Sequence, residues 1–184
     1  MLYHFARVLL KMYFAIYLGP IKIVGKENLP DINFILVAPH HYLWDAPVLA
    51  VTLVSTTFFF MAKKELFSNF FFGTLLGHLN AFPVDRKKPG TRSIKMPIRE
   101  LRRGSKSMII FPTGSRFSTQ IKPGYLMIAH ASQVPVVPAT IKHSKWGQTV
   151  IEIGRPYFVN EAVNSRTKEN HYQNLLDAYE SIGA

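Results

Sequence analysis

The stretch that most constrains this chain is a short apolar run, Phe34-Ile35-Leu36-Val37, which leads directly into Ala38-Pro39-His40-His41-Tyr42-Leu43-Trp44-Asp45. A four-residue run that is rich in branched side chains and bounded by polar residues and proline predicts a buried strand. Where this strand ends, the chain exposes His40, and the carboxylate of Asp45 follows five positions later. The stretch therefore predicts both an element of the core and a site beside it.

The residue types at this strand end are suited to proton transfer. A neutral imidazole can take a proton from a hydroxyl near pH 7, and a carboxylate can fix its tautomer and stabilise the imidazolium that forms. This is the chemistry of acyl transfer to an alcohol without a serine or cysteine nucleophile. The structural alternative is a pair of loop histidines, His40 and His41, with Asp45 capping a helix. The rest of the chain decides between the catalytic and the structural interpretation, because a function depends on a whole site.

Short apolar runs alternate with helical segments along the whole sequence, which predicts an α/β layered fold with helices flanking a mostly parallel central sheet. We expect one domain over residues 1–184, with a membrane-interface helix over 1–18 and a catalytic core over 19–184. Pro97 is expected to kink or split its helix. The expected strands are 21–24, 34–37, 57–61, 81–84, 107–111, 136–142 and 149–153, and helices are expected from Asp45, over 66–79, 89–103 and 124–131, and around Tyr172 to Tyr179.

Composition narrows the class of function. The 184 residues contain no cysteine, which excludes disulfides, thiolate metal sites and cysteine nucleophiles. The formal net charge of +11 calls for an anionic partner, which can be nucleic acid, an anionic membrane surface or a phosphorylated substrate. Nucleic acid is disfavoured because the cations are scattered among apolar runs, without a zinc-finger, helix-turn-helix or ribonucleoprotein motif.

The first eighteen residues predict an amphipathic helix. No basic region precedes the apolar run and no small-residue cleavage site follows it, so it does not resemble a signal peptide. Arg7 and Lys11 interrupt the run, which disfavours a membrane-spanning helix. On a helix, His4, Arg7 and Lys11 fall within about 60° of arc, with apolar residues around the rest. Such a helix lies in a membrane interface, or alternatively covers the core.

A second apolar segment, residues 66–79, is rich in phenylalanine and broken by glycine. Its large side chains are expected in the core, or in the wall of a groove for an acyl chain. The segment contains Phe67, Phe70, Phe71, Phe72, Leu75 and Leu76.

Polar clusters follow four of the expected strands. Ligands of such sheets bind beyond the carboxyl ends of the strands, so we expect these clusters to share one edge. Arginine forks suit phosphate oxygens, which makes Arg86 and Arg116 candidate phosphate-binding residues, and N–H groups next to Gly114 can help to hold an anion. The clusters are His40 and Asp45; Lys63 and Lys64; Asp85 and Arg86; and Thr113 to Arg116.

Four blocks, in order, resemble the 1-acylglycerol-3-phosphate acyltransferase (lysophosphatidic acid acyltransferase) family. His40 and Asp45 match its catalytic motif of histidine, four residues and aspartate. The second block has its glycine, phenylalanine and acceptor-binding arginine at Gly77, Phe82 and Arg86. The third block is Phe111-Pro112-Thr113-Gly114-Ser115-Arg116, followed by Lys122 and Gly124, and the fourth is Val134-Pro135-Val136-Val137-Pro138.

The resemblance implies the layered acyltransferase fold and transfer of a fatty acyl group to the free hydroxyl of lysophosphatidic acid. The implied donor is a thioester of acyl carrier protein or coenzyme A, with no cofactor and no metal. His40 and Asp45 would be catalytic, and Arg86, Arg116 and Lys122 would bind the substrate phosphate. The implied location is the cytoplasmic face of the cell membrane, peripheral or monotopic, on an anionic surface.

One position departs from the family pattern. Thr113 stands where the family usually has a glutamate associated with acceptor binding, and a threonine hydroxyl cannot be an ionic partner. Two alternatives therefore stay open: an acyltransferase of the same fold acting on another lysophospholipid or polar acceptor, and a non-catalytic paralogue that binds anionic lipid.

Overall fold

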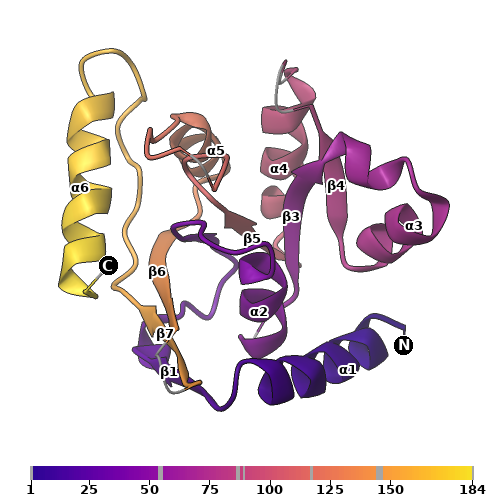
Figure 1. Cartoon of the computed structure of the whole chain (residues 1–184). Helices are drawn as coiled ribbons and strands as arrows, with labels where there is room; N and C mark the ends of the chain where they lie inside the picture. Colours follow the sequence, from indigo (N-terminus) through magenta and orange to yellow (C-terminus); the bar gives the residue numbers. More distant parts are fainter. Residues whose placement is uncertain are drawn as a thin grey trace.

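A seven-stranded sheet forms the centre of the molecule, in the order β1-β7-β6-β2-β5-β3-β4 (Figure 1). The computed structural model describes residues 2–53, 56–85, 88, 90–116, 118–143 and 147–183, without the side chains of 2–7, 72 and 143. Every neighbouring pair of these strands is parallel except β6 and β7, which confirms the predicted mostly parallel sheet. The strands are β1 (Ile21–Val24), β2 (Ile35–Val37), β3 (Phe58–Lys63), β4 (Ala81–Val84), β5 (Ser107–Ile110), β6 (Val136–His143) and β7 (Thr149–Ile153).

Helices cover both faces of this sheet, so that the fold has three layers. One apolar cluster joins the sheet to the first two helices, and a second cluster joins its other face to the fourth, fifth and sixth. The helices are α1 (Leu2–Tyr17), α2 (Asp45–Thr52), α3 (Phe70–His78), α4 (Arg92–Arg102), α5 (Gly124–Ser132) and α6 (Lys168–Ser181), with short 3-10 helices at Lys26–Asn28 (η1) and Lys64–Phe67 (η2).

Strand β2 shows why a continuous apolar run suits the centre of such a sheet. Its three residues are completely buried. Because side chains alternate along a strand, Leu36 joins the cluster on the α1–α2 face, whereas Ile35 and Val37 join the cluster on the α4–α6 face. Both faces of the sheet are covered by helices, so the side chains that point to either face have to be apolar.

Several predicted boundaries were wrong. Strand β3 runs on to Lys63, which we expected to follow it. Residues 66–79 are not one helical stretch, because η2 ends at Phe67 and α3 begins at Phe70. Pro97 lies inside α4 and does not split it, so the prediction of a split was wrong. This proline is buried, and its missing N–H removes one backbone hydrogen bond from the helix.

The exposed side chains of α1 and α3 are unusually apolar. Helix α1 packs against α2 through the buried Phe14, yet Ile16 is 85% exposed. Phe70 and Phe71 of α3 are 78% and 82% exposed, so the prediction that they lie in the core was wrong. Phe71 instead lines a surface groove together with Leu66 and Leu75. No helix in the described part of the chain is long and apolar enough to cross a membrane. Of the predicted cationic stripe on α1, Lys11 is exposed, and the side chains of His4 and Arg7 lie outside the description.

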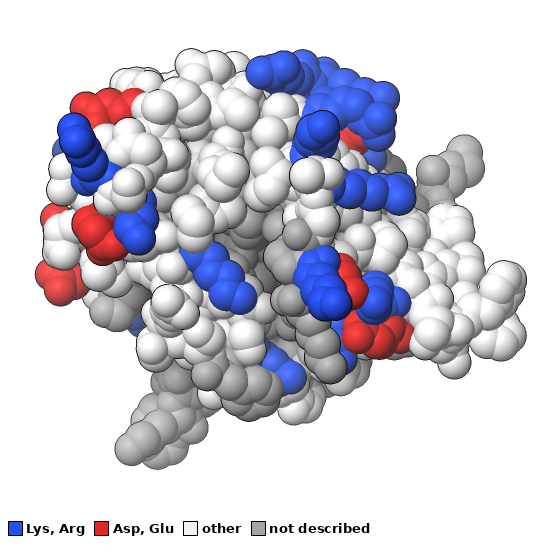
Figure 2. Space-filling model, turned by 90° about the horizontal axis from the view of Figure 1, so that it is seen from above, with Lys and Arg blue, Asp and Glu red and all other residues white. Residues whose placement is uncertain are grey.

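The charged surface is mostly cationic. Seen from above, Lys and Arg side chains are spread over the molecule, and the Asp and Glu side chains are fewer (Figure 2).

Candidate active site

The strands that precede the predicted polar clusters end at one edge of the sheet, because these four strands are neighbours in the order β2-β5-β3-β4 and are parallel. Parallel strands bring their carboxyl ends to the same edge of a sheet. His40 follows β2 and Phe111 follows β5, so two segments about seventy residues apart in sequence lie next to each other.

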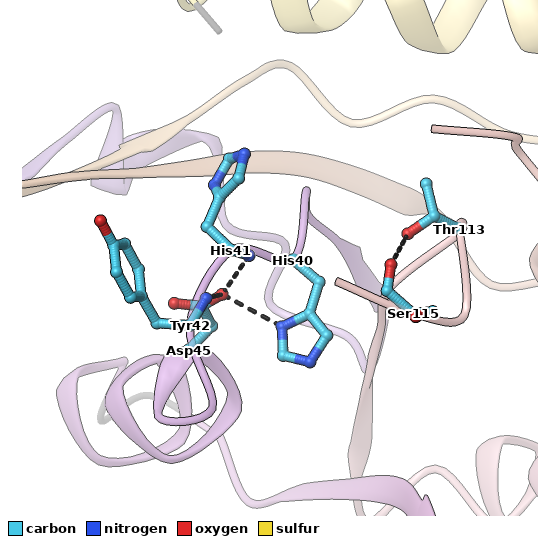
Figure 3. A network of polar contacts seen from close by, with 6 residues as sticks. All are labelled: His40, His41, Tyr42, Asp45, Thr113 and Ser115. Atoms are coloured by element: carbon cyan, nitrogen blue, oxygen red, sulfur yellow. Dashed lines mark hydrogen bonds and ion pairs between the residues drawn. The ribbon is translucent and has the colours of Figure 1, made fainter. Parts of the chain in front are cut away.

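His40 and Asp45 form a close pair at this edge (Figure 3). His40 Nδ1 lies 3.1 Å from Asp45 Oδ2, and the two side chains are only 9% and 2% exposed. A carboxylate is only an acceptor, so His40 Nδ1 donates its proton to Asp45. This assignment leaves His40 Nε2 with the free lone pair that a general base needs.

Local backbone geometry fixes the position of the carboxylate. Asp45 is the first residue of α2, and its Oδ2 also accepts hydrogen bonds from the backbone N–H groups of His41 at 2.7 Å and Tyr42 at 2.8 Å. The N-terminal end of a helix favours a negative charge. Asp45 therefore combines the helix-terminal role of the structural alternative with the orienting role of the functional one.

The ring of His40 is held from a second direction. It stacks on Phe111 with ring centroids 4.1 Å apart and an interplanar angle of 14°. His41, the other histidine of the motif, is exposed, and its ring points away from the pair (Figure 3). The side chain of His40 therefore belongs to the pair with Asp45, and the side chain of His41 does not.

A mainly apolar cavity of about 530 Å³ opens beside His40. Its walls come from the middle of β3, the ends of β4 and β5, the start of α4, the loop after β5 and helix α5. Such a cavity is large enough to enclose much of an elongated apolar ligand. The side chains that line it include Phe60, Met61, Ile94, Phe111, Met127 and Ile128.

The loop after β5 brings a cation to this cavity. Gly114 has a φ of +67°, and a Cβ atom there would lie 3.3 Å from Lys122 Nζ, so the absence of a side chain makes room for the lysine. Gly114 and Lys122 both line the cavity. The Thr113 hydroxyl instead donates a hydrogen bond to the Ser115 carbonyl at 2.9 Å, which shapes the loop internally (Figure 3).

Arg116, another predicted phosphate-binding residue, is not brought to this cavity. Arg116 is exposed, and neither it nor Thr113 is among the described residues that line the cavity. Arg86, the third candidate, lies outside the described residues. Lys64, which follows β3, forms a salt bridge of 2.6 Å with Asp85, which follows β4, and the hydrogen bond to Asp85 raises the pKa of this lysine.

The walls that α4 and α5 contribute to the cavity were not predicted from the sequence. Thr91 and Ser93 at the start of α4, and Tyr125 and Met127 of α5, line the cavity although no motif contains them. The pattern of apolar residues placed these helices on the sheet, but it could not show which of their residues face the edge. In the part of the chain that the structure describes, no three His, Asp or Glu side chains are grouped closely enough to hold a metal ion.

Comparison with known sequences gives a consistent family. A family model described as Acyltransferase matches residues 20–142. A protein named 1-acyl-sn-glycerol-3-phosphate acyltransferase from Streptococcus pneumoniae is 44% identical over 110 residues, which cover 60% of this chain and 42% of that protein. A protein of the same name from Bacillus subtilis is 39% identical over 140 residues, which cover 74% of this chain and 70% of that protein.

A solved structure shares the fold. The crystal structure of the 1-acyl-sn-glycerophosphate (LPA) acyltransferase PlsC from Thermotoga maritima superposes with a TM-score of 0.74 at 24% sequence identity. The match covers 99% of this chain and 80% of that one. The predicted layered fold is therefore confirmed, and a helix, α1, precedes the first strand as predicted.

Proposed function

This chain belongs to the acyltransferase family, and on that premise we propose that it transfers a fatty acyl group from a thioester to the free hydroxyl of lysophosphatidic acid. The observation that carries the proposal is the His40–Asp45 pair, whose His40 lines an apolar cavity. The names of the relatives support lysophosphatidic acid as the acceptor.

The reaction needs one proton shuttle. His40 Nε2 removes the proton from the acceptor hydroxyl as its oxygen attacks the thioester carbonyl carbon. Asp45 holds the ring and stabilises the imidazolium, and backbone N–H groups stabilise the negative carbonyl oxygen. The carbon–sulfur bond then breaks, and His40 returns the proton to the departing sulfur. The new ester leaves with the acceptor and the free thiol leaves with the donor.

The cavity suits the acyl chain of the donor. Its walls are mainly aliphatic and aromatic, and its few polar groups include His40 and Lys122. Burial of a chain of methylene groups there gives about 0.8 kcal/mol for each group, and the thioester carbonyl would then lie next to His40. Either a carrier protein or coenzyme A can present such a thioester.

For the acceptor phosphate we propose Arg86, Arg116 and Lys122. Lys122 has the strongest geometric support, because it lines the same cavity as His40. Thr113 makes a neutral hydrogen bond within its loop and adds no charge to this region. This observation favours one second candidate, the same reaction on another lysophospholipid or polar acceptor.

We also propose that α1 and α3 hold the protein at the membrane, where its acceptor lies. Ile16, Phe70 and Phe71 are each more than three-quarters exposed, and apolar side chains of this size gain free energy when they enter the interface. A +11 chain is attracted to anionic lipids as well.

The test is an assay of thioester consumption with lysophosphatidic acid, in wild type and in His40→Ala. We expect the variant to fold normally and to lose at least about 100-fold in activity, since a general base is worth roughly 100- to 10,000-fold. His41→Ala is the matched control and should keep most of the activity, because its ring points away from the pair. Retention of more than about a tenth of the activity by His40→Ala would refute the proton-transfer role.

The acceptor is tested in the same assay. Lysophosphatidic acid that gives no product, while another lysophospholipid does, would select the second candidate. A wild-type protein that binds anionic lipid and consumes no thioester with any acceptor would select the non-catalytic alternative.

A further inference from the structure

Helix α4 carries a dense set of cations on its solvent side. Arg92, Lys95 and Arg99 fall within about 60° of arc on the helix, and all three are exposed. The opposite side, with Pro97 and Leu101, is buried against the sheet. We call Arg92, Lys95 and Arg99 the basic face of α4. Figure 2 shows a dense group of Lys and Arg side chains at the upper right, on the side where α4 lies.

These three cations have no partner among the described acidic residues. Glu100, the only acidic residue of α4, pairs with Arg103 at 2.6 Å. Arg102 is also occupied, because its guanidinium donates to the carbonyl of Ala131 at the end of α5. The basic face therefore stays available for a partner, whereas its neighbours serve the fold.

The arrangement works against the stability of the helix. Arg92 lies in the first turn, where the helix dipole favours an anion, and that turn has no acidic residue. Lys95 and Arg99 are four residues apart, a spacing at which like charges repel each other. A feature that breaks local rules of stability in this way points to a role in binding.

The basic face is contiguous with the proposed active site. Arg92, Lys95 and Arg99 line a depression on the surface together with Thr91 and Met96. Thr91 also lines the cavity beside His40. A ligand bound on this face can therefore pass a flexible arm over Thr91 into the cavity without crossing the molecule.

The surroundings favour a soluble protein over a membrane as the partner. Helix α4 packs on the sheet face opposite to that covered by α1. The exposed apolar side chains of α1 and α3 have no counterpart here, since the described residues between 88 and 116 include no exposed large apolar side chain. A helix that inserts in a membrane interface needs such side chains, whereas electrostatic docking of two proteins does not.

We propose that the basic face of α4 docks the acidic surface of a carrier protein, which delivers the acyl group as a thioester into the cavity. This inference rests on the proposed function and names the donor for the same site. Complementary charge of this kind accelerates encounter and sets orientation, and it weakens as salt rises.

The test variant reverses the charge of the basic face by combining Arg92→Glu, Lys95→Glu and Arg99→Glu. The control combines Lys26→Glu, Arg155→Glu and Arg166→Glu, which are exposed cations outside α4 and change the net charge equally. Two donors with the same acyl chain are compared, acyl carrier protein thioester and coenzyme A thioester, each with lysophosphatidic acid. Binding of acyl carrier protein is also measured directly by fluorescence anisotropy, and thermal unfolding checks the fold of both variants.

For the α4 variant we expect KM for the carrier-protein thioester, and Kd for the carrier protein, to rise at least about tenfold, with KM for the coenzyme A thioester changed less than about twofold. In wild type the carrier-protein Kd should rise with ionic strength, and the control variant should behave as wild type.

Three results would overturn the inference: an equal change of KM for both donors, loss of binding to anionic vesicles without a change in carrier binding, or no measurable binding of the carrier protein to wild type. The proposed function fails separately, if wild type consumes neither thioester. The anisotropy measurement still decides the docking question in that case, because it needs no turnover.

Discussion

Asp45→Asn isolates the charge of the carboxylate from its shape. In wild type, Asp45 Oδ2 accepts three hydrogen bonds, from His40 Nδ1 and from the N–H groups of His41 and Tyr42. The asparagine carbonyl can accept the same three bonds, so the position of the ring is retained. The imidazolium that forms during the reaction then faces a neutral group instead of an anion.

Asp45→Asn should change both the free energy of unfolding and kcat. Asp45 Oδ1 is buried and has no hydrogen-bond partner among the described residues. In the variant an amide N–H₂ takes this place, and a buried unsatisfied donor costs about 1–3 kcal/mol of the free energy of unfolding. Loss of the buried anion beside the imidazolium should lower kcat by about 100- to 10,000-fold, or roughly 3–5 kcal/mol in the barrier.

Steady-state thioester consumption with lysophosphatidic acid measures kcat and KM, and thermal unfolding measures stability. We expect kcat to fall and both KM values to stay within about threefold, because Asp45 acts through His40 and does not line the cavity. Asp31→Asn, at an exposed aspartate, is the charge-matched control and should change neither quantity. A folded Asp45→Asn protein with near-wild-type kcat would show that the carboxylate does not stabilise a charged imidazole.

The remaining predictions concern the loop, alkaline stability and the membrane surface. Gly114→Ala should lower the free energy of unfolding by about 1–2 kcal/mol, because the φ of Gly114 is +67°, and a denaturant titration measures this change. The added methyl group should also displace Lys122 and so raise KM for the acceptor, which steady-state kinetics measures. Burial raises the pKa of Tyr157 to about 12, whereas the unfolded chain loses this proton near 10. The free energy of unfolding should therefore be highest below pH 10 and fall by about 2–3 kcal/mol from this residue as the pH rises to 12; Tyr157→Phe should remove that part of the pH dependence. Ile16→Glu combined with Phe71→Glu should weaken binding to anionic vesicles at least about tenfold in a flotation assay without loss of fold, and unchanged binding would contradict the proposed membrane surface.

The sequence alone determined the parts that depend on short-range pattern. Strand β2 could be predicted because its burial on both faces requires an unbroken apolar run. The His40–Asp45 pair could be predicted because only five positions separate the two residues, and because the amides of His41 and Tyr42, which lie between them, fix the carboxylate. Contacts between residues so close in sequence depend mainly on the local backbone conformation.

Tertiary structure decided which distant residues share the site. The sequence favoured Arg116 as a phosphate-binding residue, and Lys122 was added only by the family resemblance. Of these two residues, however, Lys122 is the one that reaches the described wall of the cavity, where Gly114 leaves room for its side chain. The stacking of Phe111 on His40 likewise depends on β2 and β5 being neighbours, with about seventy residues of chain between them.

The basic face of α4 also depends on both levels of structure. Helical periodicity can show that Arg92, Lys95 and Arg99 lie on one side of a helix. It cannot show that this side borders the cavity through Thr91, or that the helix lies on the sheet face opposite to α1. Those facts follow from the order of the strands and from the packing of each helix on the sheet, and both are set by contacts between residues far apart in the chain.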